Sequence, residues 1–99
     1  MLIKLENQNF EELIQNKKVV VDFYATWCGP CKMFSPVFEK VSNEIDIPFI
    51  KIDVDAHQEI ARKYGIMSIP TILLLNNKET TKKHMGFMNE EELKKFIGE

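Results

Sequence analysis

The chain has 99 residues, of which 44% are hydrophobic, and we expect one compact domain over residues 1–99 whose core needs no disulfide staple. Its 13 Lys and Arg against 15 Asp and Glu give a net charge of -2, which provides no basic surface for nucleic acid or an anionic membrane. No apolar stretch resembles a secretory signal or approaches the roughly 20 residues that span a bilayer, so we expect a cytoplasmic protein.

Apolar periodicity and turn residues predict an alternation of strands and helices. In chain order we expect strands at 2–5 and 19–25, with a short helix from 10 to about 15 between them. A helix that starts near 29 and keeps an apolar face to 45 is followed by a strand at 49–54 and a short helix that ends before residue 65. Strands at 71–75 and 80–85 and a last helix from residue 90 complete the chain. Strand 19–25 is rich in β-branched and aromatic residues, as expected of a strand buried on both faces.

Capping residues mark the helix ends. Asn9, Asp55 and Asn89 are each followed three residues later by Glu or Gln, and we expect each to cap the helix after it. Gly65 is expected to end the third helix, and residues 76–78 to form a tight hairpin turn. The order β-α-β-α-β-α-β-β-α predicts an α/β sheet of parallel strands, with an antiparallel hairpin at one edge and helices on both faces.

Both cysteines of the chain lie in the stretch WCGPCK at 27–32. A purely structural disulfide is disfavoured, because closing a loop of about four residues stabilises the fold by only roughly 2 kcal/mol. A zinc site would need His57 and His84 as further ligands, and these lie in segments with unrelated patterns, so two solvated histidines are the simpler interpretation. A redox-active pair is therefore the favoured interpretation of Cys28 and Cys31.

The two cysteines are predicted to lie where a central strand ends and a helix begins, which is where open α/β sheets place their sites. At the helix start, unpaired backbone N–H groups and the helix dipole favour the thiolate of Cys28, so we expect it to be the attacking thiol. Cys31, one turn inside the helix, suits the resolving role. Gly29 permits close approach of a partner, and Pro30 fixes φ without adding a donor.

Asp22 interrupts the apolar run of strand 19–25. One interpretation places its side chain on a solvated face of the sheet. If it is buried instead, the pKa of its carboxyl rises, because burial disfavours the charged form. A buried Asp22 close to the cysteines could take a proton from Cys31 through a water molecule.

The segment WCGPCK, preceded by VVVDFYAT and followed later by SIPT, resembles the thioredoxin family in order, spacing and length over nearly the whole chain. The resemblance implies the thioredoxin fold, a central five-stranded mixed sheet flanked by helices. It implies a thiol–disulfide oxidoreductase that reduces protein disulfides, and Gly29-Pro30 is similar to the dipeptide of the reducing members. It also implies that Asp22 carries the proton-transfer role and that Lys51 lies close to it.

On sequence alone the Ile69–Pro70 bond is expected to be trans, because only about 5–6% of such bonds in folded proteins are cis. The resemblance reverses this expectation and implies a cis proline that faces the cysteines and leaves the Ile69 backbone free to pair with an extended substrate segment. Trp27 is expected to be partly exposed beside Cys28, in an apolar rim. Gly86 either forms the opposite rim or simply ends a strand as a turn residue, and both interpretations remain open.

The resemblance further implies how the protein would be supplied with electrons. It implies no bound cofactor beyond a redox-active Cys28–Cys31 disulfide, and electrons from NADPH through a thioredoxin reductase. The substrates would be proteins with disulfides, and we expect a monomer without a metal. An alternative is a binding module or scaffold subunit that acts independently of redox chemistry.

Overall fold

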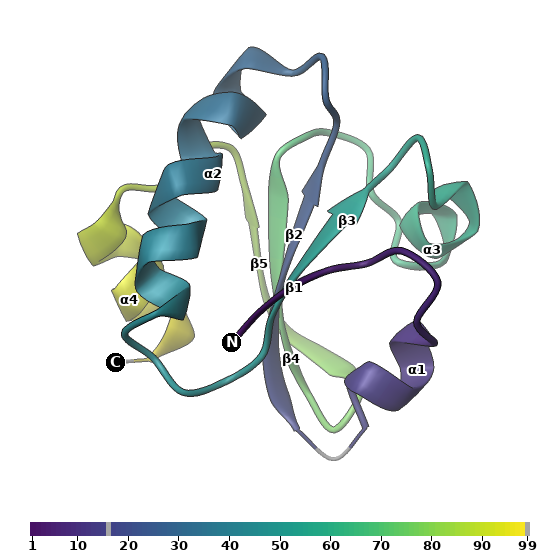
Figure 1. The fold of residues 1–99 in the computed structure, drawn as a ribbon, viewed down its shortest axis with the longest axis horizontal. Coiled ribbons are helices and arrows are strands. Elements are labelled where there is room, and N and C mark those ends of the chain that lie inside the picture. The colour runs from purple at the N-terminus through teal and green to yellow at the C-terminus, as the bar shows by residue number, and fades with distance from the viewer. Residues whose placement is uncertain (16, 99) are drawn as a thin grey trace.

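The computed structural model describes residues 1–15 and 17–98, which form a five-stranded sheet covered by helices on both faces (Figure 1). In chain order the elements are β1 (Leu2–Lys4), α1 (Phe10–Leu13), β2 (Lys18–Tyr24), α2 (Gly29–Ser42), β3 (Phe49–Asp53), α3 (Gln58–Lys63), β4 (Thr71–Asn76), β5 (Glu79–Met85) and α4 (Glu90–Ile97). The predicted order of elements is confirmed. Within these described residues, no helix has both the length and the apolar character that a membrane span requires.

The strands are arranged in the order β1-β3-β2-β4-β5. β1 and β2 run parallel to β3, whereas β4 runs antiparallel to β2, and β5 antiparallel to β4. The prediction that β4 would be parallel to the preceding strands is therefore wrong. Helix α3, only 6 residues long, lies beside the carboxyl end of β3 and does not run back along the sheet (Figure 1), so β4 starts at that same end.

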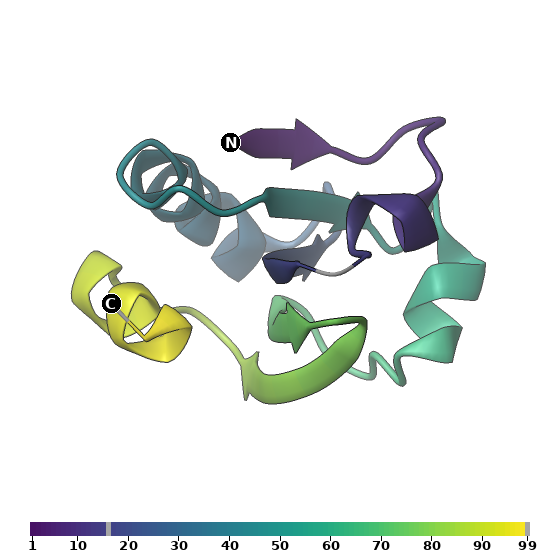
Figure 2. The ribbon, with the colours of Figure 1, turned by 90° about the horizontal axis from the view of Figure 1, so that it is seen from below.

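Two apolar cores lie on the two faces of the sheet. In Figure 2, α2 and α4 lie on one side of the sheet, and α1 and α3 on the other. Alternate residues of β2 point to opposite cores: Val20 packs on the α2–α4 side, while Val21 and Phe23 pack on the other. Asp22 therefore faces the α2–α4 side, in line with Val20, and this places a carboxyl group beneath α2.

The helix caps follow the sequence expectations at two of three positions. The Asn9 side chain accepts a hydrogen bond from the Glu12 amide at the start of α1, and Asn89 forms a capping box with Glu92 at the start of α4. The expectation that Asp55 caps α3 is wrong: His57 occupies the N-cap, without a side-chain cap bond, and the Asp55 carboxylate points elsewhere.

Positive φ angles mark the end of α3 and the hairpin between β4 and β5. Gly65, with φ 66°, follows the last turn of α3, as expected. In the hairpin between β4 and β5, both Asn77 and Lys78 have positive φ, 52° and 71°. A two-residue turn of this kind matches the twist of the two strands, which explains why a lysine is accepted there.

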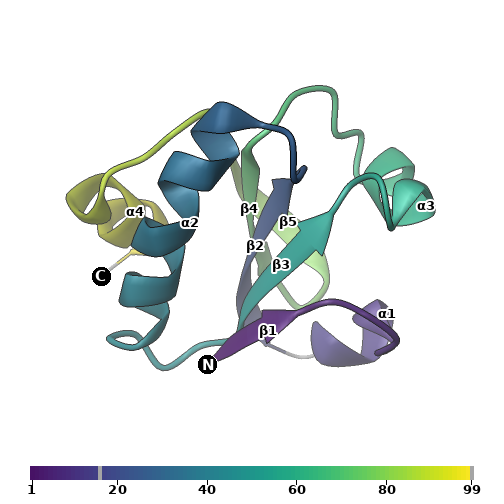
Figure 3. The ribbon, with the colours of Figure 1, turned by 45° about the horizontal axis from the view of Figure 1, so that its top comes forward.

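Three segments meet at the carboxyl ends of β2 and β3. Figure 3 shows the loop from β2 into α2 at this end of the sheet. The Ile69 carbonyl oxygen lies 3.9 Å from Cys28 Sγ, which brings the chain before β4 to the start of α2. The Gly86 amide donates to the Pro70 carbonyl at 2.8 Å, which adds the end of β5.

Candidate active site

Cys28 is the N-cap residue of α2, with extended backbone angles (φ -89°, ψ 116°). Its Sγ accepts a hydrogen bond from the Cys31 amide at 3.2 Å, so one of the free N–H groups at the helix start points at the sulfur. Cys28 and Cys31 form a disulfide, with Cα atoms 5.2 Å apart. Their exposed fractions are 5% and 3%, so the two residues differ little in access to solvent in this oxidised form.

Trp27 projects from the surface directly before the disulfide, and its side chain is 68% exposed. The indole Nε1 donates a hydrogen bond to Asp55 Oδ2 at 2.8 Å. This bond fixes the ring orientation although most of the ring is in solvent. Sequence reasoning missed Asp55 as a residue of this site; the signal was its position just after β3, at the same end of the sheet as Cys28.

We predict that Asp55→Ala lowers the steady-state fluorescence anisotropy of Trp27, because the ring loses the hydrogen bond that holds it. Trp27 is the only tryptophan, so the signal reports this ring alone. Asp55→Asn is the matched control, since it keeps an oxygen acceptor of the same reach and should retain the wild-type anisotropy. Equal anisotropy in wild type and Asp55→Ala would show that packing, and not this bond, orients the ring.

The Ile69–Pro70 peptide bond is cis, as the resemblance implied. Gly86 has φ 105°, a conformation that side-chain-bearing residues rarely adopt, and a Cβ built there would meet no atom within 4 Å. The positive φ favours glycine at this position, as in a turn. The space beside its Cα is open. The positive φ agrees with the turn interpretation, and the rim role of Gly86 stays a prediction.

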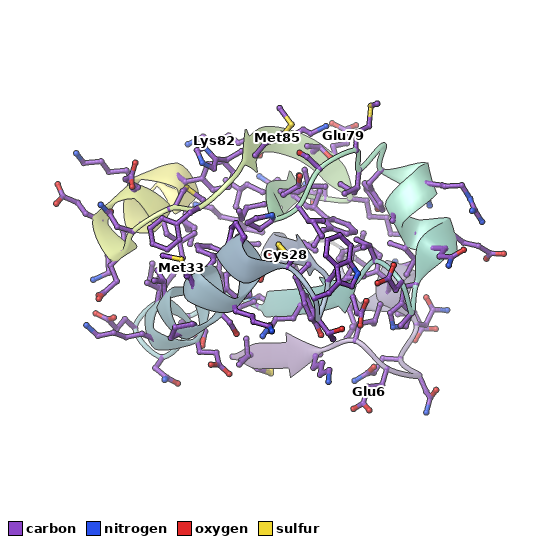
Figure 4. The ribbon with its side chains drawn as sticks, turned by 90° about the horizontal axis from the view of Figure 1, so that it is seen from above. Glu6, Cys28, Met33, Glu79, Lys82 and Met85 are labelled. Atoms are coloured by element: carbon purple, nitrogen blue, oxygen red, sulfur yellow. A yellow bond between two sulfur atoms is a disulfide. The ribbon has the colours of Figure 1, made fainter. Side chains whose placement is uncertain are left out.

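A mostly apolar pocket lies on one side of the disulfide. It has a volume of about 200 Å³ and lies next to Trp27 and Ile69. Val54, Ile66, Met67 and Ser68 complete its lining, and Met67 is 94% exposed. Figure 4 looks onto this end of the molecule, where Cys28 lies near the centre, Met33 on the α2 side and Met85 on the β5 side.

Asp22 is buried, with 1% of its surface exposed, so the solvated interpretation is wrong. Within residues 1–15 and 17–98, its Oδ1 has no hydrogen-bond partner. Burial raises the pKa of the Asp22 carboxyl from 3.8 to about 7, and the charge of Lys51 offsets this rise only in part. The carboxyl group therefore titrates near neutral pH.

Lys51 lies beside Asp22, as the resemblance implied, because the two residues are register partners on β3 and β2. Its ammonium donates to Ser35 Oγ on α2 at 2.6 Å and lies 4.9 Å from the centre of the Tyr24 ring. A pocket of about 210 Å³ has Cys31, Ser35 and Lys51 in its lining, together with Tyr24, Ala25, Thr26 and Lys32.

The two histidines are engaged away from the cysteines. His57 Nε2 lies 3.1 Å from the Leu5 carbonyl oxygen, and the His84 ring packs edge-on against Phe96. Across the described ranges 1–15 and 17–98, no three side chains of the His, Cys, Asp or Glu type come together in a group that could hold a metal. The zinc interpretation has no ligand set in this part of the chain.

The disulfide lies at the start of a helix that packs on a mixed β-sheet, above a buried carboxyl group. This combination defines a thiol–disulfide oxidoreductase. The chain belongs to the thioredoxin family: the family model described as Thioredoxin matches residues 1–99.

Individual relatives agree with this assignment. A thioredoxin of Mycoplasmoides gallisepticum is 48% identical over 86 residues, which cover 86% of each chain. A thioredoxin of Bacillus subtilis is 42% identical over 98 residues, covering 97% of this chain and 94% of its own. These similarities favour redox chemistry over the scaffold alternative.

Solved structures give the same result. A thioredoxin from Schistosoma mansoni is similar with a TM-score of 0.89 and 41% identity, covering 97% of this chain and 92% of its own. A thioredoxin from Nicotiana alata is similar with a TM-score of 0.86 and 38% identity, covering 97% and 89% of the two chains. The thioredoxin fold expected from the resemblance is confirmed.

Proposed function

We propose that this protein reduces disulfide bonds of other proteins, with Cys28 as the attacking thiol and Cys31 as the resolving thiol. The observation that carries the proposal is the position of Cys28 Sγ at the start of α2, where the Cys31 amide donates to it. A helix N-terminus stabilises negative charge, and the thiolate is the nucleophile in disulfide exchange. Catalysed reduction of insulin by dithiothreitol tests the proposal; a rate equal to that of dithiothreitol alone would refute it.

The exchange has two steps. The Cys28 thiolate attacks one sulfur of the substrate disulfide, forms a mixed disulfide and releases the other substrate sulfur, which takes up a proton. Cys31 then loses its proton and attacks Cys28 Sγ, which forms the Cys28–Cys31 disulfide and expels the second substrate thiol. Two electrons pass to the substrate, and the oxidised form found in the structure is the product of this cycle.

Asp22 is the proposed acceptor of the Cys31 proton. Its carboxyl group has a pKa of about 7, which is the range in which a general base works best near neutral pH. The pocket of about 210 Å³ lined by Cys31 and Lys51 is large enough to admit water beside Cys31. The same arrangement supports Lys51 as a residue that tunes the carboxyl group rather than one that reacts.

Substrate docks, in this proposal, on an apolar rim formed by Trp27, Ile69, Pro70 and Gly86. The exposed Trp27 ring and the pocket beside Ile69 offer apolar contacts, and an extended segment could pair with the Ile69 backbone. Gly29 and Pro30 occupy the first two positions of α2. Neither carries a long side chain, so neither adds bulk beside Cys28 that an incoming disulfide would have to displace.

Gly86→Trp is predicted to slow insulin reduction by about tenfold or more, because a large side chain would occupy the docking space. Gly86→Ala is the matched control: both variants strain a backbone with φ 105°, and only the tryptophan adds bulk. The alanine variant should be less stable by about 1–2 kcal/mol and still reduce insulin. Reduction of a small aromatic disulfide, which needs no docking, should be equal in the two variants, and equal insulin rates would remove Gly86 from the rim.

We propose that residues 1–99 act as a single, monomeric domain in the cytoplasm, and that a thioredoxin reductase passes electrons to it from NADPH. This supply of electrons rests on the membership of the chain in the thioredoxin family. The test is NADPH consumption in the presence of insulin and a bacterial thioredoxin reductase, which should require Cys28 and Cys31 together.

A further inference from the structure

Ser35 lies on α2 one turn after Cys31, on the side of the helix that faces the sheet beside Asp22 and Lys51. Its hydroxyl oxygen accepts a hydrogen bond of 2.6 Å from the half-buried Lys51 ammonium. The Tyr24 ring lies on another side of that ammonium, 4.9 Å from Nζ. Lys51 is thus held by a hydroxyl group and an aromatic ring, although the carboxyl group of its register partner Asp22 is buried nearby.

This arrangement has a consequence for Asp22. Its Oδ1 lacks a hydrogen-bond partner in the ranges 1–15 and 17–98 and would accept one from a lysine that turned toward it. An ammonium in direct contact favours the carboxylate strongly, whereas one held at a distance favours it less. The position of the Lys51 ammonium therefore decides how readily the Asp22 carboxyl group holds a proton.

We propose that Ser35 is a positioning residue: its hydroxyl group holds the Lys51 ammonium against α2 and away from Asp22, so that the buried carboxyl group stays unpaired. The raised pKa of Asp22, in which the charge of Lys51 offsets burial only in part, agrees with this geometry. The role of Ser35 in resolution rests on the proposed function of Asp22 as the acceptor of the Cys31 proton.

Other groups around Asp22 do not replace Lys51 in this role. Asp53 lies on the same face of β3 as Lys51, and Tyr24 lies on the same face of β2 as Asp22. Burial raises the pKa of the Tyr24 hydroxyl, so this group stays neutral near pH 7. On α2, Cys31 is in the disulfide and Lys32 lines the same pocket with an exposed side chain. The register partner of Asp22 on β4 is the uncharged Ile72.

The test is a titration of the Asp22 side-chain carbon by NMR in the oxidised protein, without substrate. Ser35→Ala should move the titration midpoint to lower pH by about one unit or more, because the freed ammonium turns to the carboxylate. Ser35→Thr keeps the hydroxyl group and should restore the wild-type midpoint. An unchanged midpoint in Ser35→Ala would overturn the inference, since water would then be an equivalent partner for Lys51.

A double-mutant cycle with Lys51→Met shows whether the hydroxyl group acts through the lysine. In the Lys51→Met background, which carries no ammonium, Ser35→Ala should leave the midpoint where it is. An equal shift in both backgrounds would overturn the inference, because Ser35 would then act on Asp22 directly.

The acid limb of the pH profile for release of substrate from the mixed disulfide should move with the Asp22 midpoint. The titration needs no substrate, so it tests the inference separately from the proposed function. If the inference fails, the titration midpoint of Asp22 is unchanged in Ser35→Ala. If the proposed function fails, the wild type does not reduce insulin.

Discussion

Cys28→Ser is expected to lower the rate of insulin reduction by on the order of 10³-fold or more, to the rate of the dithiol alone. A serine hydroxyl is not ionised near neutral pH, so the helix start would have no anion to stabilise and the substrate disulfide no nucleophile. Insulin reduction with dithiothreitol as the electron source measures this loss. The fold should remain, because Cys28 and Cys31 close a loop of only a few residues whose cross-link contributes roughly 2 kcal/mol.

Cys31→Ser provides the matched variant, since it removes the other sulfur and leaves Cys28 in place. It should form a mixed disulfide with substrate that persists, because no thiol resolves it, and this adduct should be visible by mass spectrometry. Cys28→Ser should form no such adduct. If Cys28→Ser trapped substrate and Cys31→Ser did not, the assignment of the two roles would be reversed.

Asp22→Asn is expected to change how stability depends on pH. The pKa of this carboxyl group is raised in the folded protein, from 3.8 to about 7, so the folded state binds a proton more tightly than the unfolded state between these values. The contribution is fully present below pH 3.8 and is lost as pH rises through about 7. The wild type should therefore lose up to roughly 4 kcal/mol of stability over this range, and Asp22→Asn should not.

Urea unfolding of the oxidised protein at pH 4 and pH 8 measures this difference. At pH 4 the two proteins should be similar, because an amide and a protonated carboxyl group are both neutral and polar. At pH 8 the variant should be more stable, although the resolving step should be slower. Asp46→Asn, at an exposed carboxyl group, is the control and should show no such change. A constant difference between wild type and Asp22→Asn from pH 4 to pH 8 would show that Asp22 is not the titrating group.

Several features followed from the sequence because their causes are local. The capping residues at Asn9 and Asn89 need only a side chain and an amide three positions away, and both caps are present. The position of Cys28 at the helix start follows from the pattern of a strand, a turn and a helix around WCGPCK. The sequence left two possibilities for Asp22, and the apolar residues on both sides of it in β2 favoured burial, which the structure shows.

Family resemblance added what local patterns could not provide. The cis bond before Pro70 runs against the base rate for proline, and only the similarity of SIPT to the thioredoxin family led to its prediction. Nothing in the neighbouring residues distinguishes the two isomers. The closeness of Lys51 to Asp22 was likewise implied by resemblance, because the strands that carry them are distant in sequence.

The sequence by itself determined the order of elements, the starts of α1, α2 and α4 and the place of the two sulfurs, since these depend on residues within about one helical turn of each other. Only the tertiary structure decided which partners distant polar groups take. Asp55, expected to cap α3, instead binds the Trp27 indole 28 positions away, and Lys51 binds Ser35 across 16 positions. The tertiary structure also decided the direction of β4, because this direction depends on where α3 packs and not on the residue pattern of β4 itself. A polar side chain with several possible partners binds the one that packing brings nearest. The distance between residues far apart in the sequence cannot be read from the sequence pattern.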